Sequence, residues 1–139
     1  MNKIMLLTIV LSCFLNADLI EDGLDALNKG NIKKSIKLYS KACDDGNTKG
    51  CNYAGMMYHY GITIKGGTLK QDTRKALKFF TKACDGGNTR GCVLLGIMYY
   101  EGTGVRQDKR KAKELFGKAC DDGEDKGCRA YRKLNEEGI

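Results

Sequence analysis

The stretch KACDDGNTKGC, residues 41–51, occurs in three versions along this chain of 139 residues. It returns as KACDGGNTRGC at residues 82–92 and as KACDDGEDKGC at residues 118–128. Each version contains two cysteines with seven residues between them. The lysine and alanine before the first cysteine suit the last turn of a helix, and the glycine three residues after it suits a left-handed helix stop. The stretch therefore predicts the end of a helix.

A second helix is expected to begin directly after each of these glycines. Asn47, Asn88 and either Glu124 or Asp125 occupy the position where such a helix takes an N-terminal cap or an acidic first turn. The second cysteine then falls within the first turns of the second helix. The repeated stretch thus predicts a tight helix-turn-helix that its own pair of cysteines can join.

The first seventeen residues have the features of a secretory signal peptide. Lys3 precedes an apolar run at residues 4–15, and the small residue Ala17 precedes a polar stretch. The run is shorter than the about 20 residues of a membrane-spanning helix, so we expect no transmembrane segment. Cleavage after Ala17 would give a secreted or periplasmic protein in which residues 18–139 form a single domain. In the alternative interpretation, Cys13 is the lipidated cysteine of a lipoprotein.

Six of the seven cysteines follow residue 17, and they form three pairs of identical spacing. Six cysteines allow many connectivities in principle. Equivalent positions in a repeat should make equivalent bonds, and an oxidising compartment lets such bonds persist. The predicted disulfides are Cys43 with Cys51, Cys84 with Cys92, and Cys120 with Cys128.

A zinc site is the alternative use of these cysteines. Zinc ligands usually lie about two to four residues apart and often include histidine, whereas His59 is the single histidine of the chain. Nucleotide-binding loops are not recognisable either, because the glycines at residues 66–67 and 102–104 lack the lysine and serine that follow in such loops. We therefore expect neither a metal nor a cofactor.

The repetition extends between the cysteine pairs with a period of 36 residues, the separation of Cys84 and Cys120. A period of this length is typical of a solenoid of helical hairpins. Five additional residues in the second unit fall at 61–70, which we interpret as a loop because extra loop length costs little.

Each unit is predicted to contain an A helix followed by a B helix. The A helices are expected to begin near Asp18, Thr48, Thr89 and Asp125, and the B helices to follow the caps Asn31, Asp72 and Asp108. Each B helix carries a stripe of buried positions in the same register: Ser35, Leu38, Tyr39 and Ala42; Ala76, Phe79, Phe80 and Ala83; Ala112, Leu115, Phe116 and Ala119. The predicted fold is all-α, a right-handed α/α solenoid of three disulfide-joined hairpins with a C-terminal capping helix.

Gly55 and Gly96 lie in the middle of predicted A helices, where glycine costs about 1 kcal/mol relative to alanine. Tight contact with a neighbouring helix is the expected reason. Tyr58 and Tyr99 follow almost one turn later and are expected in the core. In the first unit, Leu24 is expected at the position that corresponds to these two glycines.

The formal net charge of +7 favours acidic partners. The basic residues are nevertheless spread over equivalent helices, at spacings that fit a solvated face. Aromatic residues are not interleaved with them, and no nucleic-acid-binding module is recognisable. The sequence therefore predicts no binding to nucleic acid.

The segment LGIMYYEGTGV at residues 95–105, with Asp108, Lys111 and Ala112 after it, resembles a Sel-one-like repeat, a relative of the tetratricopeptide repeat. With the added Cys-x7-Cys pairs, the chain resembles the Helicobacter cysteine-rich protein family over residues 18–127. Such repeats generally serve as scaffolds for protein association. The cysteine-rich members are credited with penicillin binding and β-lactamase activity, so the resemblance also implies a possible β-lactamase.

The residues support the scaffold more than the enzyme. A serine β-lactamase needs a Ser-x-x-Lys pair on one helical turn. Ser35 is followed by Leu38 at the required position, and Ser40 is followed by Cys43. A metal-dependent enzyme would need several histidines. The catalytic residues of any hydrolase activity therefore stay unknown.

If the solenoid curves like its relatives, its A helices line a concave groove, and the resemblance carries over the ligand-facing positions. These are Glu21 and Asp25 in the first unit, then Asn52, Met56, His59, Val93, Ile97, Tyr100, Arg129 and Lys133. The expected occupant is a protein segment, an extended peptide, or a β-lactam or cell-wall fragment, with Arg129 or Lys133 on a carboxylate. We expect the protein to be a monomer.

Overall fold

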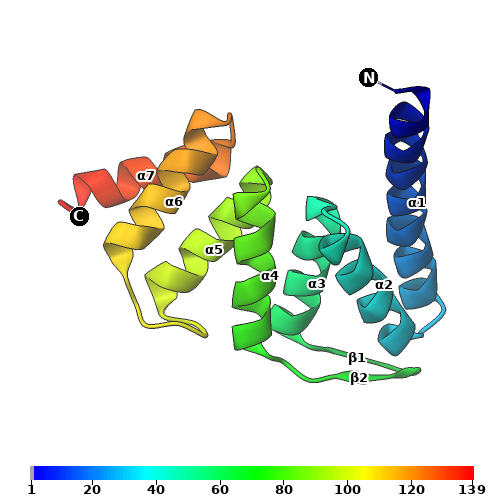
Figure 1. Ribbon diagram of the computed structural model, residues 1–139. Coiled ribbons are helices and arrows are strands. Elements are labelled where there is room, and N and C mark those ends of the chain that lie inside the picture. The colour runs from blue at the N-terminus through cyan, green and yellow to red at the C-terminus, as the bar shows by residue number, and fades with distance from the viewer. Residues whose placement is uncertain (1) are drawn as a thin grey trace.

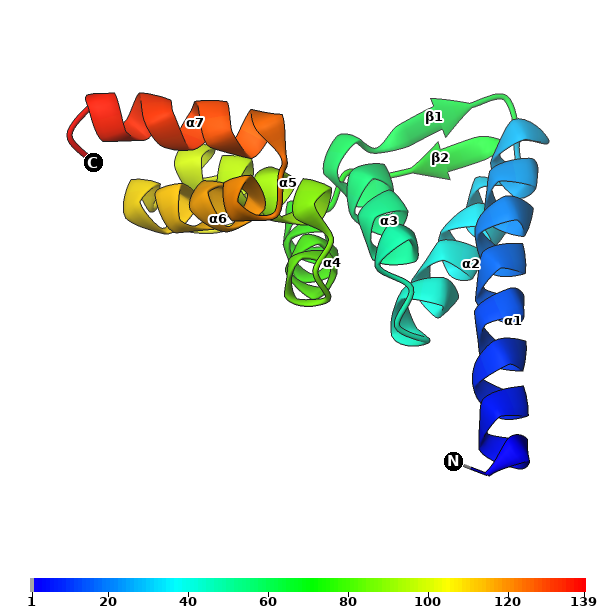
Figure 2. The same ribbon diagram turned by 90° about the horizontal axis from the view of Figure 1, so that it is seen from above.

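The computed structural model describes residues 2–139, with the side chains of residues 2–4 and 18–139. This part of the chain contains seven helices and a two-stranded hairpin: α1 (Lys3–Asn28), α2 (Ile32–Asp44), α3 (Thr48–Tyr60), β1 (Ile62–Ile64), β2 (Gly67–Leu69), α4 (Thr73–Asp85), α5 (Thr89–Glu101), α6 (Lys109–Asp121) and α7 (Asp125–Glu136). Each helix packs mainly against the helices before and after it in the chain. Figures 1 and 2 show a row of helices in chain order, with the two termini at opposite ends. The predicted fold of stacked helical hairpins is therefore confirmed.

The predicted signal peptide falls in the first half of α1, which continues without a break past residue 17. The side chain of Cys13, on which the alternative interpretation of a lipoprotein depends, lies outside the described side chains. Within the part of the chain that is described, no helix combines the length and the apolar character needed to cross a bilayer.

Side-chain caps fix where most of the helices begin. Asn31, Asp72 and Asp108 accept hydrogen bonds from backbone N–H groups in the first turns of α2, α4 and α6. Asn47 and Asn88 do the same for α3 and α5. Residue 124 occupies the cap position of α7 without a side-chain cap bond. Caps of this kind satisfy N–H groups that have no partner within the helix, which explains why the helix starts follow the sequence pattern.

The B helices α2, α4 and α6 bury most of the predicted stripe, although Leu38 and Phe79 are only half-buried. Its small residues are almost fully enclosed, and its aromatic residues fill the space between neighbouring helices. Tyr39, Phe80 and Phe116 are 3%, 1% and 4% exposed, so they belong to the core. The core follows the stack in two large clusters, one around α1–α3 and one around α4–α7.

Glycine allows the A helices to approach these aromatic rings. A Cβ atom on Gly55 would lie 2.6 Å from Phe80, and one on Gly96 would lie 2.6 Å from Phe116. The equivalent contact in the first unit is made by Gly23, whose Cβ would lie 2.5 Å from Tyr39. The prediction that Leu24 takes this position is wrong. Leu24 is instead 51% exposed.

The core positions of the A helices differ by one residue from the prediction. Met57 and Met98 are buried, at 5% and 0% exposure. Tyr58 and Tyr99, expected in the core, are only half-buried at its edge. Tyr58 stacks on Phe79 with 5.8 Å between ring centroids. The long methionine side chains reach the centre of the stack, and the tyrosines keep their hydroxyl groups near water.

Residues 61–70 form a β-hairpin instead of the expected irregular loop. Ile62 pairs with Leu69, and Ile64 pairs with Gly67, in antiparallel register. The β-branched residues of this segment favour extended backbone. The turn lies so close to the end of α1 that a Cβ atom on Gly66 would collide with the carbonyl of Gly30. In Figure 1 the hairpin passes below α3 and α2 toward α1, and it thus ties the second unit to the first.

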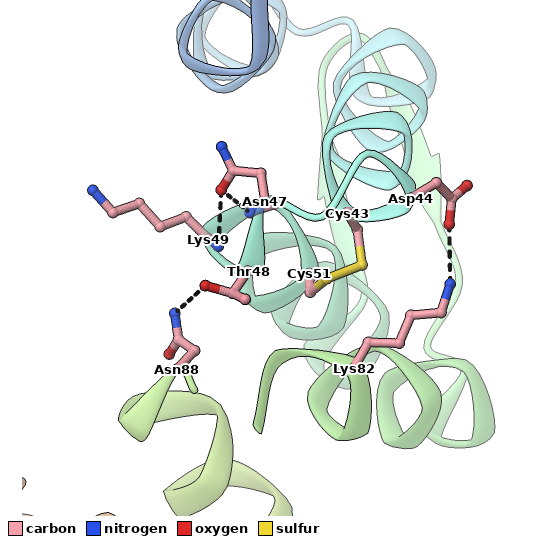
Figure 3. The surroundings of a disulfide bond; sticks show 9 residues. Cys43, Asp44, Asn47, Thr48, Lys49, Cys51, Lys82 and Asn88 are labelled. Atoms are coloured by element: carbon pink, nitrogen blue, oxygen red, sulfur yellow. Dashed lines mark hydrogen bonds and ion pairs between the residues drawn. A yellow bond between two sulfur atoms is a disulfide. The ribbon is translucent and has the colours of Figure 1, made fainter. Parts of the chain in front are cut away.

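All three predicted disulfides are present: Cys43–Cys51, Cys84–Cys92 and Cys120–Cys128. Each joins the end of a B helix to the start of the next A helix. Figure 3 shows the first of them beside two contacts to the following unit. Lys82 Nζ lies 3.0 Å from an oxygen of Asp44, and Asn88 donates a 3.4 Å hydrogen bond to Thr48. The disulfides hold the turns, while polar contacts connect successive units.

Candidate functional site

Three cavities adjoin one another across the A helices of the stack. The apolar cavity, of about 280 Å³, is lined by Leu24, Leu27, Tyr39, Tyr53, Met56, Met57, Tyr60 and Ile62. The central cavity, of about 320 Å³, is lined by Lys49, Asn52, Tyr53, Met56, Asn88, Thr89, Arg90 and Glu124. The distal cavity, of about 420 Å³, is lined by Met56, Arg90, Val93, Leu94, Ile97, Glu124 and Lys126.

Shared residues join these cavities into one surface, which we call the A-helix groove. Tyr53 and Met56 line both the apolar and the central cavity, and Arg90 and Glu124 line both the central and the distal cavity. Met56 lines all three. The groove therefore runs from the first unit to the start of the last helix.

Four of the predicted ligand-facing residues line this groove: Asn52, Met56, Val93 and Ile97. Asn52 and Val93 are nevertheless buried, at 5% and 6% exposure, because the next unit stacks over them. They form the floor of the groove, while Met56 and Ile97 are half-buried and reachable.

The structure places the other predicted residues elsewhere. His59 lies 6.2 Å from Phe80 of α4 and 4.7 Å from its neighbour Tyr60, measured between ring centroids. Tyr100 and Lys133 line a separate small cavity of about 160 Å³ between α5 and α7. Arg129 is exposed on α7, and it is not among the described residues that line these cavities.

The acidic residues predicted on the first A helix are also outside the groove. Glu21 and Asp25 are exposed on α1. Asp25 pairs with Lys29 at 2.7 Å, an exposed pair of small energetic weight. The predicted acidic start of the groove is therefore wrong, because the cavity at the first unit has an apolar lining.

A network of amides forms the floor of the central cavity. Asn88 caps α5 by accepting a hydrogen bond from the N–H of Gly91 at 3.0 Å. The same oxygen accepts a 3.2 Å hydrogen bond from the Asn52 amide nitrogen, so the Asn52 side chain must present its oxygen on the other side. That buried oxygen has no hydrogen-bond partner among the described residues. This acceptor lies buried beneath the floor of the groove.

Sequence reasoning missed the cations of the groove. Lys49, Arg90 and Lys126 occupy the same position, the ninth, in the three repeated stretches. All three line the central or the distal cavity. The available signal was this recurrence itself, one basic residue at one repeat position three times. The prediction instead placed the cations of the site at Arg129 and Lys133, toward the end of α7.

The end of the A-helix groove at the apolar cavity contains the most exposed aromatic ring among the described residues. Tyr60 is 66% exposed beside Leu24 at the mouth of the apolar cavity. Tyr39 closes the base of this cavity. Burial raises the pKa of Tyr39 above its ordinary value near 10, so its hydroxyl is neutral at physiological pH. This end of the groove therefore presents an uncharged, apolar surface.

Comparison with family models gives three matches to the Sel1 repeat, at residues 11–47, 48–88 and 89–124. The first match begins within the predicted signal peptide. Among curated proteins, no sequence matches the chain significantly.

Solved structures provide further relatives. The chain is similar to the cysteine rich protein B of Helicobacter pylori, with 31% identity over 91% of each chain and a TM-score of 0.67. It is similar to a protective antigen of uropathogenic Escherichia coli that displays an SLR fold, with 26% identity and a TM-score of 0.77. That match covers 89% of this chain but only 26% of the antigen.

A Sel1 repeat protein from Oxalobacter formigenes shares the fold, with a TM-score of 0.73 and 23% identity over 85% of this chain and 88% of that one. The resemblance inferred from the sequence is thereby confirmed for the repeat type and for the cysteine-rich relatives.

Proposed function

Because the chain belongs to the Sel1 repeat family, we propose that it is a binding protein whose A-helix groove holds an extended segment of another protein. The observation that carries this proposal is the continuity of the groove. Three cavities share lining residues across successive units, and an extended chain is the ligand that contacts a long, shallow, repeated surface most fully. Met56, Val93 and Ile97 provide apolar contact along its length.

Binding without catalysis fits the chemistry of the lining. No serine, cysteine or histidine is among the described residues that line the three cavities. Six cysteines are held in disulfides, so they cannot act as nucleophiles. For β-lactam hydrolysis, the narrower hypothesis from the sequence, the described lining therefore offers no serine or cysteine nucleophile with a histidine base. We expect a chromogenic cephalosporin to be hydrolysed no faster by the oxidised protein than by a reduced and alkylated sample.

We further propose that the protein acts after export, with cleavage after Ala17. Three disulfides persist best in an oxidising compartment. N-terminal sequencing of the exported protein should begin at Asp18. An N-terminal lipid attached to Cys13 would instead support the lipoprotein alternative.

The direct test is selection of peptides from a displayed random library by the purified oxidised protein. We expect the selection to enrich certain peptides. These peptides should not bind the Met56→Arg variant, because the Met56 side chain lines all three cavities. The control is Leu38→Arg, which adds the same charge at a half-buried position on α2. Both variants must retain the helical circular dichroism of the parent. The proposal fails if no peptide is enriched, or if Met56→Arg binds the enriched peptides as tightly as the parent does.

A further inference from the structure

The A-helix groove carries a row of cations that form no ion pair with the described residues. Lys49, Arg90 and Lys126 recur at one repeat position and line the central and distal cavities. None of the ion pairs among the described residues includes them. Among the described residues that line these two cavities, Glu124 is the one carboxylate. Three positive charges against one negative charge leave this part of the groove electropositive.

These cations occupy a position that is unfavourable for their own helices. Each is the second residue of an A helix, where the helix dipole favours an acidic side chain. The first turns of α3 and α5 contain no acidic residue at all. The B helices also carry a basic second residue, at Lys33, Arg74 and Arg110. What distinguishes Lys49, Arg90 and Lys126 is therefore that they line the cavities of the groove.

The opposite end of the groove has the opposite chemistry. The apolar cavity lies between α1 and α3, and its exposed lining is almost entirely apolar. Leu24 and Tyr60 project into water at its mouth, although they are large apolar side chains. An aromatic or branched side chain of a ligand would remove both from water, which is favourable in proportion to the buried area.

The middle of the groove is polar, and this distinguishes a peptide from a lipid. Asn52, Asn88 and Lys49 line the central cavity, and the Asn52 oxygen has no partner among the described residues. An acyl chain crossing this region would cover polar groups without bonding to them, which costs free energy. A peptide backbone offers N–H and C=O groups that can bond to the polar side chains lining this cavity.

From these observations we propose that the groove selects acidic peptide segments of a partner protein. Carboxylates of the segment lie over Lys49, Arg90 and Lys126, and one large apolar side chain several residues away fills the apolar cavity beside Tyr60. This inference rests on the proposed function, and it adds the chemistry and the orientation of the ligand. Charge attraction of this kind speeds association and weakens as salt is added.

The experiment begins with a displayed library of random peptides of about 12 residues, which span about 40 Å when extended. Relative to the unselected library, we expect enrichment of aspartate and glutamate at one end and of aromatic residues or leucine at the other. The strongest peptide is then measured on variants by fluorescence anisotropy. Arg90→Glu and Tyr60→Ala should each weaken binding by at least about tenfold, since arginine and tyrosine dominate such interfaces.

Matched controls exist for both variants. Arg110→Glu makes the same change at the second residue of another 13-residue helix, α6, outside the groove. Tyr131→Ala removes an exposed tyrosine of α7 that lines none of the three cavities. We expect both controls to bind within about twofold of the parent.

The outcomes separate the two proposals. If peptides are enriched and Met56→Arg abolishes their binding, but they are neutral or basic, the proposed function stands and this inference is wrong. The inference is equally wrong if Arg90→Glu binds as the parent does. If no peptide is enriched, both proposals fail.

Discussion

The ring of Phe80 occupies the space into which a side chain at Gly55 would extend. A Cβ atom on Gly55 would lie 2.6 Å from Cε1 of Phe80, closer than real contacts of this kind. Gly96 with Phe116 and Gly23 with Tyr39 repeat the arrangement. Each A helix therefore meets the B helix of its own unit through one glycine and one aromatic ring.

This arrangement predicts that Gly55→Ala destabilises the protein although alanine is the better helix former. The helix preference of alanine contributes about 1 kcal/mol of stability, but overpacking typically costs about 1–3 kcal/mol. We expect a net loss of up to about 2 kcal/mol in chemical denaturation. The double variant Gly55→Ala with Phe80→Leu should lose less than the two single losses added together, because the two sites are in contact.

Gly117→Ala provides the control for this prediction. It is also a glycine within a helix, but its nearest neighbour is the exposed ring of Tyr131 at 3.2 Å, which can move. This variant should be as stable as the parent or slightly more stable. Equal effects of the two substitutions would contradict a specific role for the contact between Gly55 and Phe80.

The three disulfides should differ in how readily they are reduced. Cys84 and Cys92 are each 1% exposed, and Cys43 and Cys51 are 4% and 3% exposed. Cys120 and Cys128 are only half-buried. Since reduction requires access to a sulfur atom, limiting phosphine followed by alkylation should label Cys120 and Cys128 first. Mass spectrometry that finds Cys84 or Cys92 labelled first would contradict this order.

Loss of a buried disulfide should also lower stability. Each bond closes a loop of about nine residues, which corresponds to about 2.5 kcal/mol in the chain-entropy description. We expect the pair of changes Cys84→Ala and Cys92→Ala to cost at least this amount in denaturant titration. Thiol titration of the unfolded, unreduced residues 18–139 should detect no free cysteine, and two or more reactive thiols would overturn the pairing.

Asn88 should contribute more stability than a helix cap alone. It caps α5 and also contacts Asn52 and Thr48 of the preceding unit. Removing a cap costs about 0.5–2 kcal/mol, and leaving a buried amide unpaired costs about 1–3 kcal/mol more. Asn88→Ala should therefore be more destabilising than Asn31→Ala, whose cap of α2 is exposed. Asn88→Ser should recover the cap and leave the contact with Asn52 broken. Its stability should therefore lie between that of Asn88→Ala and that of the parent.

The cations of the groove should cost their helices stability. Replacing Arg90 with glutamate puts an acidic residue in the first turn of α5, where the helix dipole favours it by about 0.3–1 kcal/mol. Arg110→Glu makes the same change in α6. Both variants should unfold at the parent's temperature or slightly above it. A marked loss of stability in Arg90→Glu alone would mean that this arginine supports the fold, contrary to the proposed role.

Much of the fold could be predicted from the sequence because its determinants are local. Asn31, Asp72 and Asp108 cap the helices that follow them, and the left-handed glycines Gly46 and Gly87 end the turns as expected. Such features depend on a few neighbouring residues. The disulfide pairing followed from repetition alone.

The position of Gly23 and the hairpin could not be predicted in this way. Only a short turn connects α1 to α2, so the first unit is out of register with the other two. That shift moves the contact with Tyr39 from residue 24 to residue 23. The hairpin depends on packing against Gly30, which is far away in sequence.

The groove was predicted only in part because its lining comes from several units. Asn52 and Val93 face the groove, but the next unit covers them. Arg129 occupies the same repeat position, and it is exposed because no described unit stacks over it. His59 and Tyr60 are consecutive residues near the end of α3. Tertiary packing turned Tyr60 toward the groove and His59 toward Phe80, and helical periodicity alone does not choose between them.

Methionine methyl spectra provide the most direct test of ligand binding in the A-helix groove. Residues 18–139 contain three methionines: Met56, which lines all three cavities, Met57 at the base of the apolar cavity, and Met98, which is 0% exposed. With carbon-13 methyl labels assigned by substitution, titration with a selected peptide should shift the Met56 signal most and leave Met98 nearly unchanged. A peptide that saturates the protein while the Met56 signal stays in place would show that it binds elsewhere, and would contradict the account.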